Sequence, residues 1–556
     1  MGQEVVQAAG ELTPDASSAA ASAQPPADDE GFVRNTAVMS VGTALSRLTG
    51  FLRVFVAGAV LGLKLLPDTY NRANTTPNIV YELVLGGILT SVFIPVFVEW
   101  FQTHGEEEAF ELARRVLTLA LIALVGVAAL GVVFAGPIIR LYMINSPTPN
   151  KADQIALGVF FLRWFMPQVV FYGVGAIATG LLNTHRRFAI GMFAPVLNNV
   201  VVMVTLGAYA WMSHGAASVA EITGAQKLVL ALGTTLGVVA MTLALWPSLR
   251  AIGFRFRWRF DLSHPAVRRL GKLAMWVVVY VVANQAAYLI VIILAAKISG
   301  ALSTYQYAFV LFQLPYAIFG VSIFTALVPG MSGRWAAGDR DGVRALQSKG
   351  LRTTAVILLP AAAGYLALAV PIAVVVFRHG NTSFAEAVLL GRTLQAFSLG
   401  LVFFALFQLL SRAFYAMQDT RTPALINIGA AAVNISADIL FTKRFGWGVR
   451  GLALGHAISY IVSTATCLVI LRRRLAGLDG RRIGRTLARV VPLAAVTGAA
   501  AWGVAHLVGT ATFPQRLAGL GTGVATGLLV FLGGSLILQI EEANELKAAV
   551  LRRLGR

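Results

Sequence analysis

Fourteen long apolar runs divide this 556-residue sequence, and they constrain its fold more than any other feature. Each run is long enough to cross a bilayer as a helix, which takes about 20 mostly apolar residues. Only 13% of the residues are charged and 57% are hydrophobic, whereas a soluble domain carries about 25% charged residues. We therefore predict an all-α, polytopic membrane protein. The expected spans are residues 35–62, 78–101, 116–142, 155–182, 188–211, 227–249, 273–296, 305–331, 353–377, 392–417, 423–442, 451–471, 487–509 and 517–540.

Positive charge is distributed unevenly among the loops. The six loops that follow even-numbered spans hold 24 Lys and Arg residues, and the seven that follow odd-numbered spans hold 11. Because cytoplasmic loops retain Lys and Arg, the even-numbered loops and both termini are predicted to be cytoplasmic. The same loops account for the net charge of +20. No nucleic-acid-binding motif accompanies that charge, so nucleic acid is not an expected partner.

An internal repeat predicts how the spans are grouped. Pro95 and Pro329 are 234 residues apart, and Asn199 and Asn434 are 235 apart, each pair within similar sequence. A repeat of six spans gives two halves with one orientation, related by an axis along the membrane normal. Two such bundles normally enclose a cavity, which suits a transporter. The predicted organisation is a disordered cytoplasmic tail (1–34), an N-terminal lobe (35–250), a C-terminal lobe (251–472), two further helices (473–540) and a basic cytoplasmic tail (541–556).

Two arginines in the first span are the main candidates for a binding site. Arg47 and Arg53 lie in the stretch SRLTGFLRVF, about 9 Å apart along a helix and about 120° apart around it. A charge at mid-membrane costs about 2.5–3.5 kcal/mol, so each needs an explanation. The planar guanidinium group suits phosphate and carboxylate. Both arginines are therefore expected to line a hydrated cavity that receives an anion.

A purely structural explanation is also open. Asp68, in the predicted loop 63–77, and Glu82, in the second span, would pair with the two arginines and hold the first spans together. Ion pairs of this kind are common in helical bundles. The two explanations are compatible if an acid holds an arginine until the anionic substrate displaces it.

Other charged residues within the spans have weaker functional interpretations. Arg163 is expected to reach the membrane interface with its long side chain. Asp438 would be a cation or proton site, but its position near Lys443 and Arg444 favours simple ion pairing.

Motifs for catalysis are absent from the sequence. HExxH, CxxC, a nucleophile elbow and a P-loop do not occur, and the seven histidines are scattered. We therefore expect no enzyme activity, no cofactor and no metal site. Because no ATPase module is present, transport would be downhill or coupled to the membrane potential or to a monovalent cation.

Several stretches resemble the MurJ (MviN) family of bacterial lipid II flippases, within the multidrug/oligosaccharidyl-lipid/polysaccharide exporter superfamily. They include SRLTGFLRV, PDTYNRANTTPN and LTSVFIPVF around the first two spans, and FYGVGAIATGLLNTHRRFAIGMFAPVLNNVV and FALFQLLSRAFYAMQDTRTPALINIGAAAVNI further on. Spans 8–10 are similar to an actinobacterial-type branch. The resemblance implies a MATE-like fold of two six-helix lobes around a cationic cavity, with two extra C-terminal helices that form a groove for the undecaprenyl tail.

The resemblance also implies roles for particular residues. The essential span-1 arginines of the family match Arg47 and Arg53, and its acidic residue after span 1 matches Asp68. Arg72, Asn78 and Glu82 are further candidates for supporting or gating roles.

This sequence departs from the family at two cavity positions. After Asn78 the family often has two arginines, where this chain has Ile79–Glu82, and it often has an arginine in span 8, where this chain has Phe309. Arg72 is the candidate that would compensate.

The expected function is lipid II flipping across the bacterial plasma membrane, for peptidoglycan synthesis and hence cell shape. Lipid II and membrane lipids are the expected partners, with cell-wall synthesis proteins as further candidates. Three alternatives stay open: a flippase for another undecaprenyl-linked oligosaccharide, a MATE-type cation-coupled antiporter, and a membrane scaffold for cell-wall enzymes. An antiporter predicts a carboxylate-lined cavity and twelve spans, whereas a scaffold predicts that the arginines are dispensable.

Overall fold

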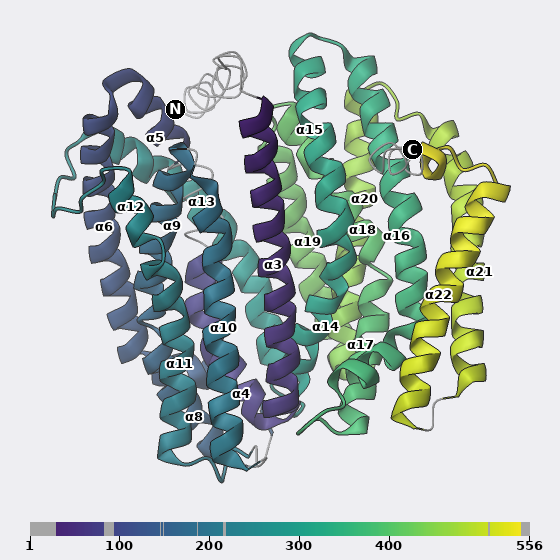
Figure 1. Ribbon diagram of the computed structural model, residues 1–556, viewed down its shortest axis with the longest axis horizontal. Helices are drawn as coiled ribbons and strands as arrows, with labels where there is room; N and C mark the ends of the chain where they lie inside the picture. Colours follow the sequence, from purple (N-terminus) through teal and green to yellow (C-terminus); the bar gives the residue numbers. More distant parts are fainter. Residues whose placement is uncertain are drawn as a thin grey trace. The chain divides into compact units, whose positions relative to one another are not determined.

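The structure is a computed structural model that describes residues 29–82, 94–144, 146–147, 150–185, 187–214, 218–509 and 512–545. Throughout these residues the regular structure is helical, and they contain no strand (Figure 1). The chain forms two compact units. Residues up to 285 make up the first unit, except for 62–64 and 145–148, which belong to the second unit together with residues 286–556.

The first unit is a bundle in which α3 packs against α10, α10 against α11, and α4 against α8 and α9. The long helix α13 begins in this unit and ends in the other. The helices are α3 (Asp29–Leu61), α4 (Leu65–Tyr81), α5 (Ile94–His104), α6 (Glu106–Val133), α7 (Ala135–Tyr142), α8 (Lys151–Phe165), α9 (Gln168–Thr184), α10 (Phe188–Ser213), α11 (Gly224–Leu243), α12 (Trp246–Ala251) and α13 (Pro265–Ala295).

In the second unit, α16 packs against both α17 and α21, and α21 packs along α22 at the yellow end of the chain in Figure 1. The predicted pair of extra C-terminal helices thus consists of α21 and α22. The elements are α14 (Ala301–Pro315), η2 (Tyr316–Gly320), α15 (Val321–Ala336), α16 (Arg340–Phe377), α17 (Phe384–Ser398), α18 (Leu401–Ala416), α19 (Arg421–Ile439), η3 (Leu440–Arg444), α20 (Gly448–Arg474), α21 (Gly480–Val508) and α22 (Phe513–Ile537).

Local sequence determines several helix ends. α11, α17 and α22 each begin with a capping box, in which a Thr or Ser hydroxyl accepts a backbone amide and a Gln or Glu three residues later returns the bond. α8 and α9 are separated by a break at Pro167. Proline breaks the helix because it lacks the amide hydrogen needed for the next helical hydrogen bond. The pair α17 and α18 bends by 46° at its break.

The described helices agree with a polytopic membrane protein. Eleven helices are long and apolar enough to cross a membrane, and the bent pair α17–α18 makes a twelfth. The predicted second span contains residues 83–93, which lie outside the described part of the chain. The seventh, 273–296, ends one residue beyond α13, where the described residues provide only a shorter apolar stretch, Gln285–Ala295. The total of fourteen spans stays a prediction, as do the lobe boundaries at 250 and 472.

Two boundaries differ from the expectation. α3 begins at Asp29, so residues 29–34 are helical and not part of a disordered tail. Acidic residues at the start of a helix stabilise it by interacting with the positive end of the helix dipole. The segment 63–77 was expected to be a loop, but α4 occupies it from Leu65 onward. Its polar residues lower the hydropathy, whereas in the structure they are packed against neighbouring helices. The tail residues 1–28 and 546–556 lie outside the described residues.

The even-numbered loops of the first unit meet one another. The guanidinium group of Arg115 lies 3.4 Å from the carboxylate of Asp261, which joins the second-span and sixth-span loops. Nε2 of His185 lies 3.5 Å from the Glu106 carboxylate, which joins the fourth-span loop to the same place. Loops that were predicted to share one side of the membrane therefore share one end of this unit.

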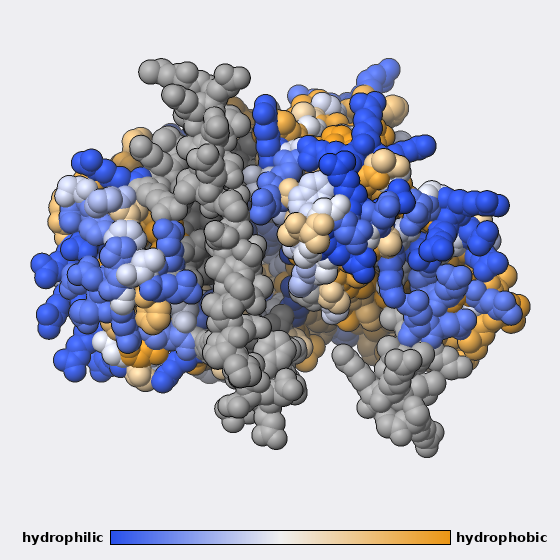
Figure 2. Space-filling model, turned by 90° about the horizontal axis from the view of Figure 1, so that it is seen from above, coloured by the Kyte–Doolittle hydropathy of each residue, from blue (hydrophilic) through white to orange (hydrophobic). Residues whose placement is uncertain are grey.

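The even-numbered loops of the second unit also meet. Arg344 lies 3.7 Å from Asp479, and Arg474 lies 2.5 Å from Asp419. Burial raises the pKa of the Asp419 carboxyl, but hydrogen bonds from Thr422 and the charge of Arg474 outweigh this and hold the pKa below its usual value. Hydrophilic residues gather over helix ends in the view of Figure 2.

Close packing of α17 on α16 gives a testable consequence. A Cβ atom added at Gly391 would lie 2.6 Å from the Val370 Cα atom and 2.9 Å from the Ala369 carbonyl oxygen, both on the backbone of α16. We expect Gly391→Ala to lower the free energy of unfolding by about 1–3 kcal/mol, because overpacking must push the helices apart. Thermal denaturation in detergent measures this. Gly364→Ala on α16 is the matched control, since its Cβ would meet nothing within 4 Å; equal losses of Tm in the two variants would contradict the prediction.

Candidate functional site

The face of α3 that packs on α10 is fixed by a polar contact. The Asn199 side-chain amide of α10 donates to the Ser46 carbonyl at 3.3 Å and to the Thr49 hydroxyl at 3.0 Å. Gly50 lies on the same face, where a Cβ would be 3.6 Å from the Asn199 amide nitrogen. These contacts set the rotation of α3 about its own axis, and therefore the directions in which its two arginines point.

Arg53 is half-buried. It interacts electrostatically with Tyr70 of α4 and Tyr172 of α9, and each of these tyrosines is only 8% exposed. The Tyr70 hydroxyl also forms a 2.7 Å hydrogen bond with the Thr234 hydroxyl. The interaction of Arg53 with both tyrosines indicates that its side chain lies on the side of α3 nearest α4 and α9.

The tyrosine cluster extends to two of the predicted supporting residues. The Tyr172 hydroxyl donates to the Asn78 side-chain oxygen at 3.5 Å, and the rings of Tyr172 and Tyr81 lie 4.5 Å apart between centroids. Tyr81 interacts electrostatically with Glu82. Asn78 and Glu82 are both exposed. Through Tyr81 and Tyr172, the structure therefore links Arg53 of α3 to Asn78 of α4 and to Glu82, which follows α4.

Arg47 lies elsewhere on α3. Its side chain is exposed, and its position is about 120° around the helix from Arg53. Within the described residues, neither arginine has a carboxylate within the 4.0 Å that defines an ion pair. The two cations thus do not form a single clamp, and protein carboxylates in this part of the chain do not neutralise them.

Asp68 and Arg72 form a buried ion pair with each other. They are 0% and 3% exposed, lie one turn apart on α4 and approach to 3.3 Å. Arg72 also donates to the Met143 sulfur at 3.2 Å. The structural explanation, in which Asp68 neutralises an arginine of the first span, therefore does not fit this arrangement. Arg72 is not a free cavity cation that would compensate for those missing from the sequence.

A second buried acid lies in the other unit. Asp438 of α19 is 0% exposed, one turn after the buried Asn434, and interacts electrostatically with Tyr305. The predicted ion pairing of Asp438 with Lys443 and Arg444 is wrong, because the described structure has no such ion pair. The turn η3 places both basic residues at the surface, whereas Asp438 faces α20.

The position of Asp438 depends on a glycine of α20. A Cβ at Gly455 would lie 2.1 Å from the Asp438 carboxylate oxygen, so only glycine lets the acid approach the α20 backbone this closely.

Phe309 occupies the position where the resemblance implies an arginine. It packs against Tyr305 and Phe397, with ring centroids 6.4 and 5.6 Å away. This position therefore contributes aromatic packing and no charge.

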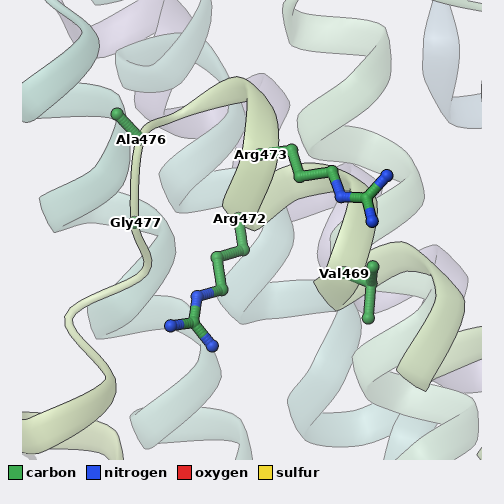
Figure 3. A pocket seen from close by; sticks show the side chains of 5 residues that line it. All are labelled: Val469, Arg472, Arg473, Ala476 and Gly477. Carbon is green, nitrogen blue, oxygen red and sulfur yellow. The ribbon is translucent and has the colours of Figure 1, made fainter.

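A separate surface pocket lies at the end of α20. Val469, Arg472, Arg473, Ala476 and Gly477 line it. In Figure 3 the side chains of Arg472 and Arg473 point in different directions, so they do not converge on one small anion.

The tyrosines were not among the residues that the sequence singled out. Tyr70, Tyr81 and Tyr172 occur in or beside apolar runs, where a tyrosine usually serves in packing or in the aromatic belt at the membrane interface. Only the polar residues around Tyr70, in PDTYNRANTTPN, signal that this segment is unusual. In the described part of the chain, no group of three or more His, Cys, Asp or Glu side chains is placed to hold a metal ion.

Comparison with solved structures identifies the fold. "Lipid II flippase MurJ, inward closed conformation" aligns with a TM-score of 0.73 at 21% identity, over 90% of this chain and 98% of that one. An inward-facing multidrug resistance MATE family transporter of the MOP superfamily aligns with a TM-score of 0.64 at 14% identity, over 77% of this chain and 96% of that one. The fold is therefore that of the MOP-superfamily membrane transporters.

Sequence comparison gives the family. The family model described as "Lipid II flippase MurJ" matches residues 57–518, and the chain belongs to this family. A probable lipid II flippase MurJ of Rhizobium meliloti is 28% identical over 73% of this chain and 74% of its own length. The lipid II flippase MurJ of Burkholderia cenocepacia is 26% identical over 78% and 82%. A probable lipid II flippase MurJ of Vibrio cholerae is 26% identical over 90% and 96%.

Proposed function

We propose that this protein moves lipid II, the undecaprenyl-pyrophosphate-linked peptidoglycan precursor, from the inner to the outer leaflet of the bacterial plasma membrane. The observation that carries the proposal is the environment of Arg53, which is half-buried, interacts electrostatically with Tyr70 and Tyr172 and has no carboxylate partner in the described structure. A retained, uncompensated cation in a membrane protein marks a path for an anion. Membership of the family supplies the identity of that anion.

The chemistry assigns the arginines to the headgroup. Guanidinium groups bind phosphate with paired, charge-assisted hydrogen bonds, so Arg53 would hold the pyrophosphate and Arg47 a second anionic group of the same headgroup. Asn78 and the tyrosine hydroxyls would orient Arg53. The prenyl tail would stay in lipid along α21 and α22 while the headgroup crosses by alternating access.

The membrane potential would bias the direction. With the cytoplasm negative, each negative charge that moves outward gains about 2.3 kcal/mol per 100 mV. Two charges on the headgroup would therefore suffice without ATP. This direction requires cytoplasmic termini and even-numbered loops, an orientation that the excess of Lys and Arg in those loops favours.

Complementation tests the proposal. A bacterial host depleted of its own lipid II flippase should resume growth when this protein is expressed in its membrane. Failure by a protein that reaches normal membrane levels would favour the runner-up, a flippase for another undecaprenyl-linked oligosaccharide. Drug efflux by the same cells without growth rescue would favour a cation antiporter.

Asp438 gives a prediction about coupling. A carboxylate that is fully buried and has no basic partner in the described structure needs a bound cation or a proton. We expect Asp438→Asn to fold with an unchanged or higher Tm but to make transport insensitive to the concentration of monovalent cations and protons. Reconstituted transport measured across a range of Na⁺, K⁺ and pH would show this. The same cation and pH dependence in the variant as in the wild type would contradict it.

A further inference from the structure

An unusual segment connects α12 to α13 (Figure 1). Residues 253–262, with the sequence GFRFRWRFDL, alternate aromatic and arginine side chains and have no regular secondary structure after the turn at Gly253. The transport mechanism makes no use of them. Because the helices on either side approach and leave the membrane, the segment must lie close to the membrane surface.

Contacts with α6 fix the depth of this segment. The Arg114 side chain donates to the Arg255 carbonyl at 2.9 Å, and the Arg259 amide donates to the Thr118 hydroxyl at 3.0 Å. α6 is polar from Glu106 to Arg115 and apolar from Val116 onward. The backbone of residues 255–259 therefore lies where α6 passes from its polar end into its apolar run, which is the depth of the lipid headgroups.

Two of the aromatic side chains, Phe254 and the half-buried Phe256, pack against the core of the unit. Phe254 is 3% exposed and contacts Phe110, with 5.6 Å between ring centroids. Trp258, Phe260 and Leu262 are 66%, 67% and 58% exposed. In water this exposure is unfavourable, whereas aromatic side chains at the membrane interface bury their rings between headgroups and acyl chains.

The charges beside the exposed rings favour an anionic surface. Arg259 pairs with Glu111 at 3.3 Å, and Asp261 pairs with Arg115 at 3.4 Å. The Arg255 and Arg257 side chains are exposed, and within the described residues neither has an ion pair. Two uncompensated cations thus stand next to exposed aromatic rings at headgroup depth, and acidic lipids attract clusters of this kind.

We propose that residues 253–262 form an interfacial anchor that binds acidic phospholipid headgroups through Arg255 and Arg257 while Trp258 and Phe260 insert among the lipids. An acidic protein partner would use the same charges, but it would not require apolar rings at the depth where α6 becomes apolar. The proposal concerns the protein's membrane surface and is independent of the substrate that it transports.

A single fluorescent label tests the anchor. Cys467 is the only cysteine and is buried, so the Leu262→Cys variant on a Cys467→Ala background carries one environment-sensitive probe at the end of the segment. The protein is placed in nanodiscs, which leave both membrane faces accessible, with either phosphatidylcholine alone or 40% phosphatidylglycerol. We expect the iodide quenching constant to be at least threefold smaller with the acidic lipid, and lipids with a headgroup-level nitroxide to quench the probe.

Charge variants separate the anchor from a general effect of net charge. Adding Arg255→Gln and Arg257→Gln should remove most of the threefold difference, as should 0.5 M salt, because screening weakens surface attraction. Arg255→Lys with Arg257→Lys should retain it. Arg472→Gln with Arg473→Gln, which removes the same charge from the pocket on α20, should leave it unchanged. Equal iodide quenching in both lipids, or protection that appears only in native membranes and points to a protein partner, would overturn the proposal.

Discussion

Replacing Arg53 by alanine is expected to abolish growth rescue in cells depleted of their own lipid II flippase. Arg53 is the half-buried cation that interacts electrostatically with Tyr70 of α4 and Tyr172 of α9. Removing it deletes a charge-assisted contact worth about 1.5–3 kcal/mol to a phosphate group, which corresponds to about a 10–150-fold loss of transport. Arg47→Ala is expected to act in the same direction, since Arg47 would bind a second charged group.

Three controls make the arginine prediction specific. Arg53→Lys keeps the charge but loses the planar fork, so we expect intermediate rescue if phosphate binding is the role and full rescue if the charge only pairs with an acid. Arg163→Ala removes an exposed arginine of α8 and should retain full rescue. Membrane levels and Tm must match the wild type in every variant. Full rescue by well-expressed Arg53→Ala and Arg47→Ala would eliminate the cationic-cavity mechanism but leave the fold and family unchanged.

Replacing Asp68 by asparagine is expected to lower the free energy of unfolding by about 3–5 kcal/mol. Asp68 and Arg72 are 0% and 3% exposed, and removing one member of a buried pair leaves the other charge uncompensated. Thermal denaturation of the purified protein in detergent measures the loss. The resemblance assigns Asp68 a supporting role in transport, so stability must be measured separately from activity.

The double variant distinguishes a structural pair from a functional acid. Asp68→Asn combined with Arg72→Met removes both charges, and we expect it to recover most of the lost stability. If the recovered protein also transports lipid II, the pair serves only to hold α4 in place. If the double variant instead loses as much stability as the two single variants added together, a direct interaction between the residues is contradicted.

Most of the helices could be predicted from apolar runs, and the reason for the exceptions is physical. The run 451–471 lies within α20 and 487–509 nearly coincides with the apolar part of α21, because a stretch of about 20 mostly apolar residues is long enough to cross a membrane as a helix. α4 was missed because hydropathy treats Asp68 and Arg72 as solvated, whereas each neutralises the other inside the bundle. Hydropathy responds to composition and does not detect pairing.

The candidate site was predictable only in part. A charge within an apolar span stands out in the sequence, which is why Arg47 and Arg53 were identified. The tyrosines that interact with Arg53 come from α4 and α9, and a tyrosine's neighbours on other helices depend on packing that sequence spacing does not encode. The same limit explains Asp438. Its nearest basic residues in the sequence, Lys443 and Arg444, point to the surface.

The most direct test of the account is lipid II translocation by the purified protein in proteoliposomes. Lipid II with a labelled stem peptide is incorporated into vesicles, and an impermeant reagent measures the fraction on the outer face over time, with and without an imposed potential. We predict that the wild-type protein accelerates translocation, that a potential negative on the departing side increases the rate, and that Arg53→Ala reduces it by at least tenfold. Equal translocation in protein-free vesicles and in wild-type vesicles, with correctly folded protein, would contradict the central claim that this protein flips lipid II.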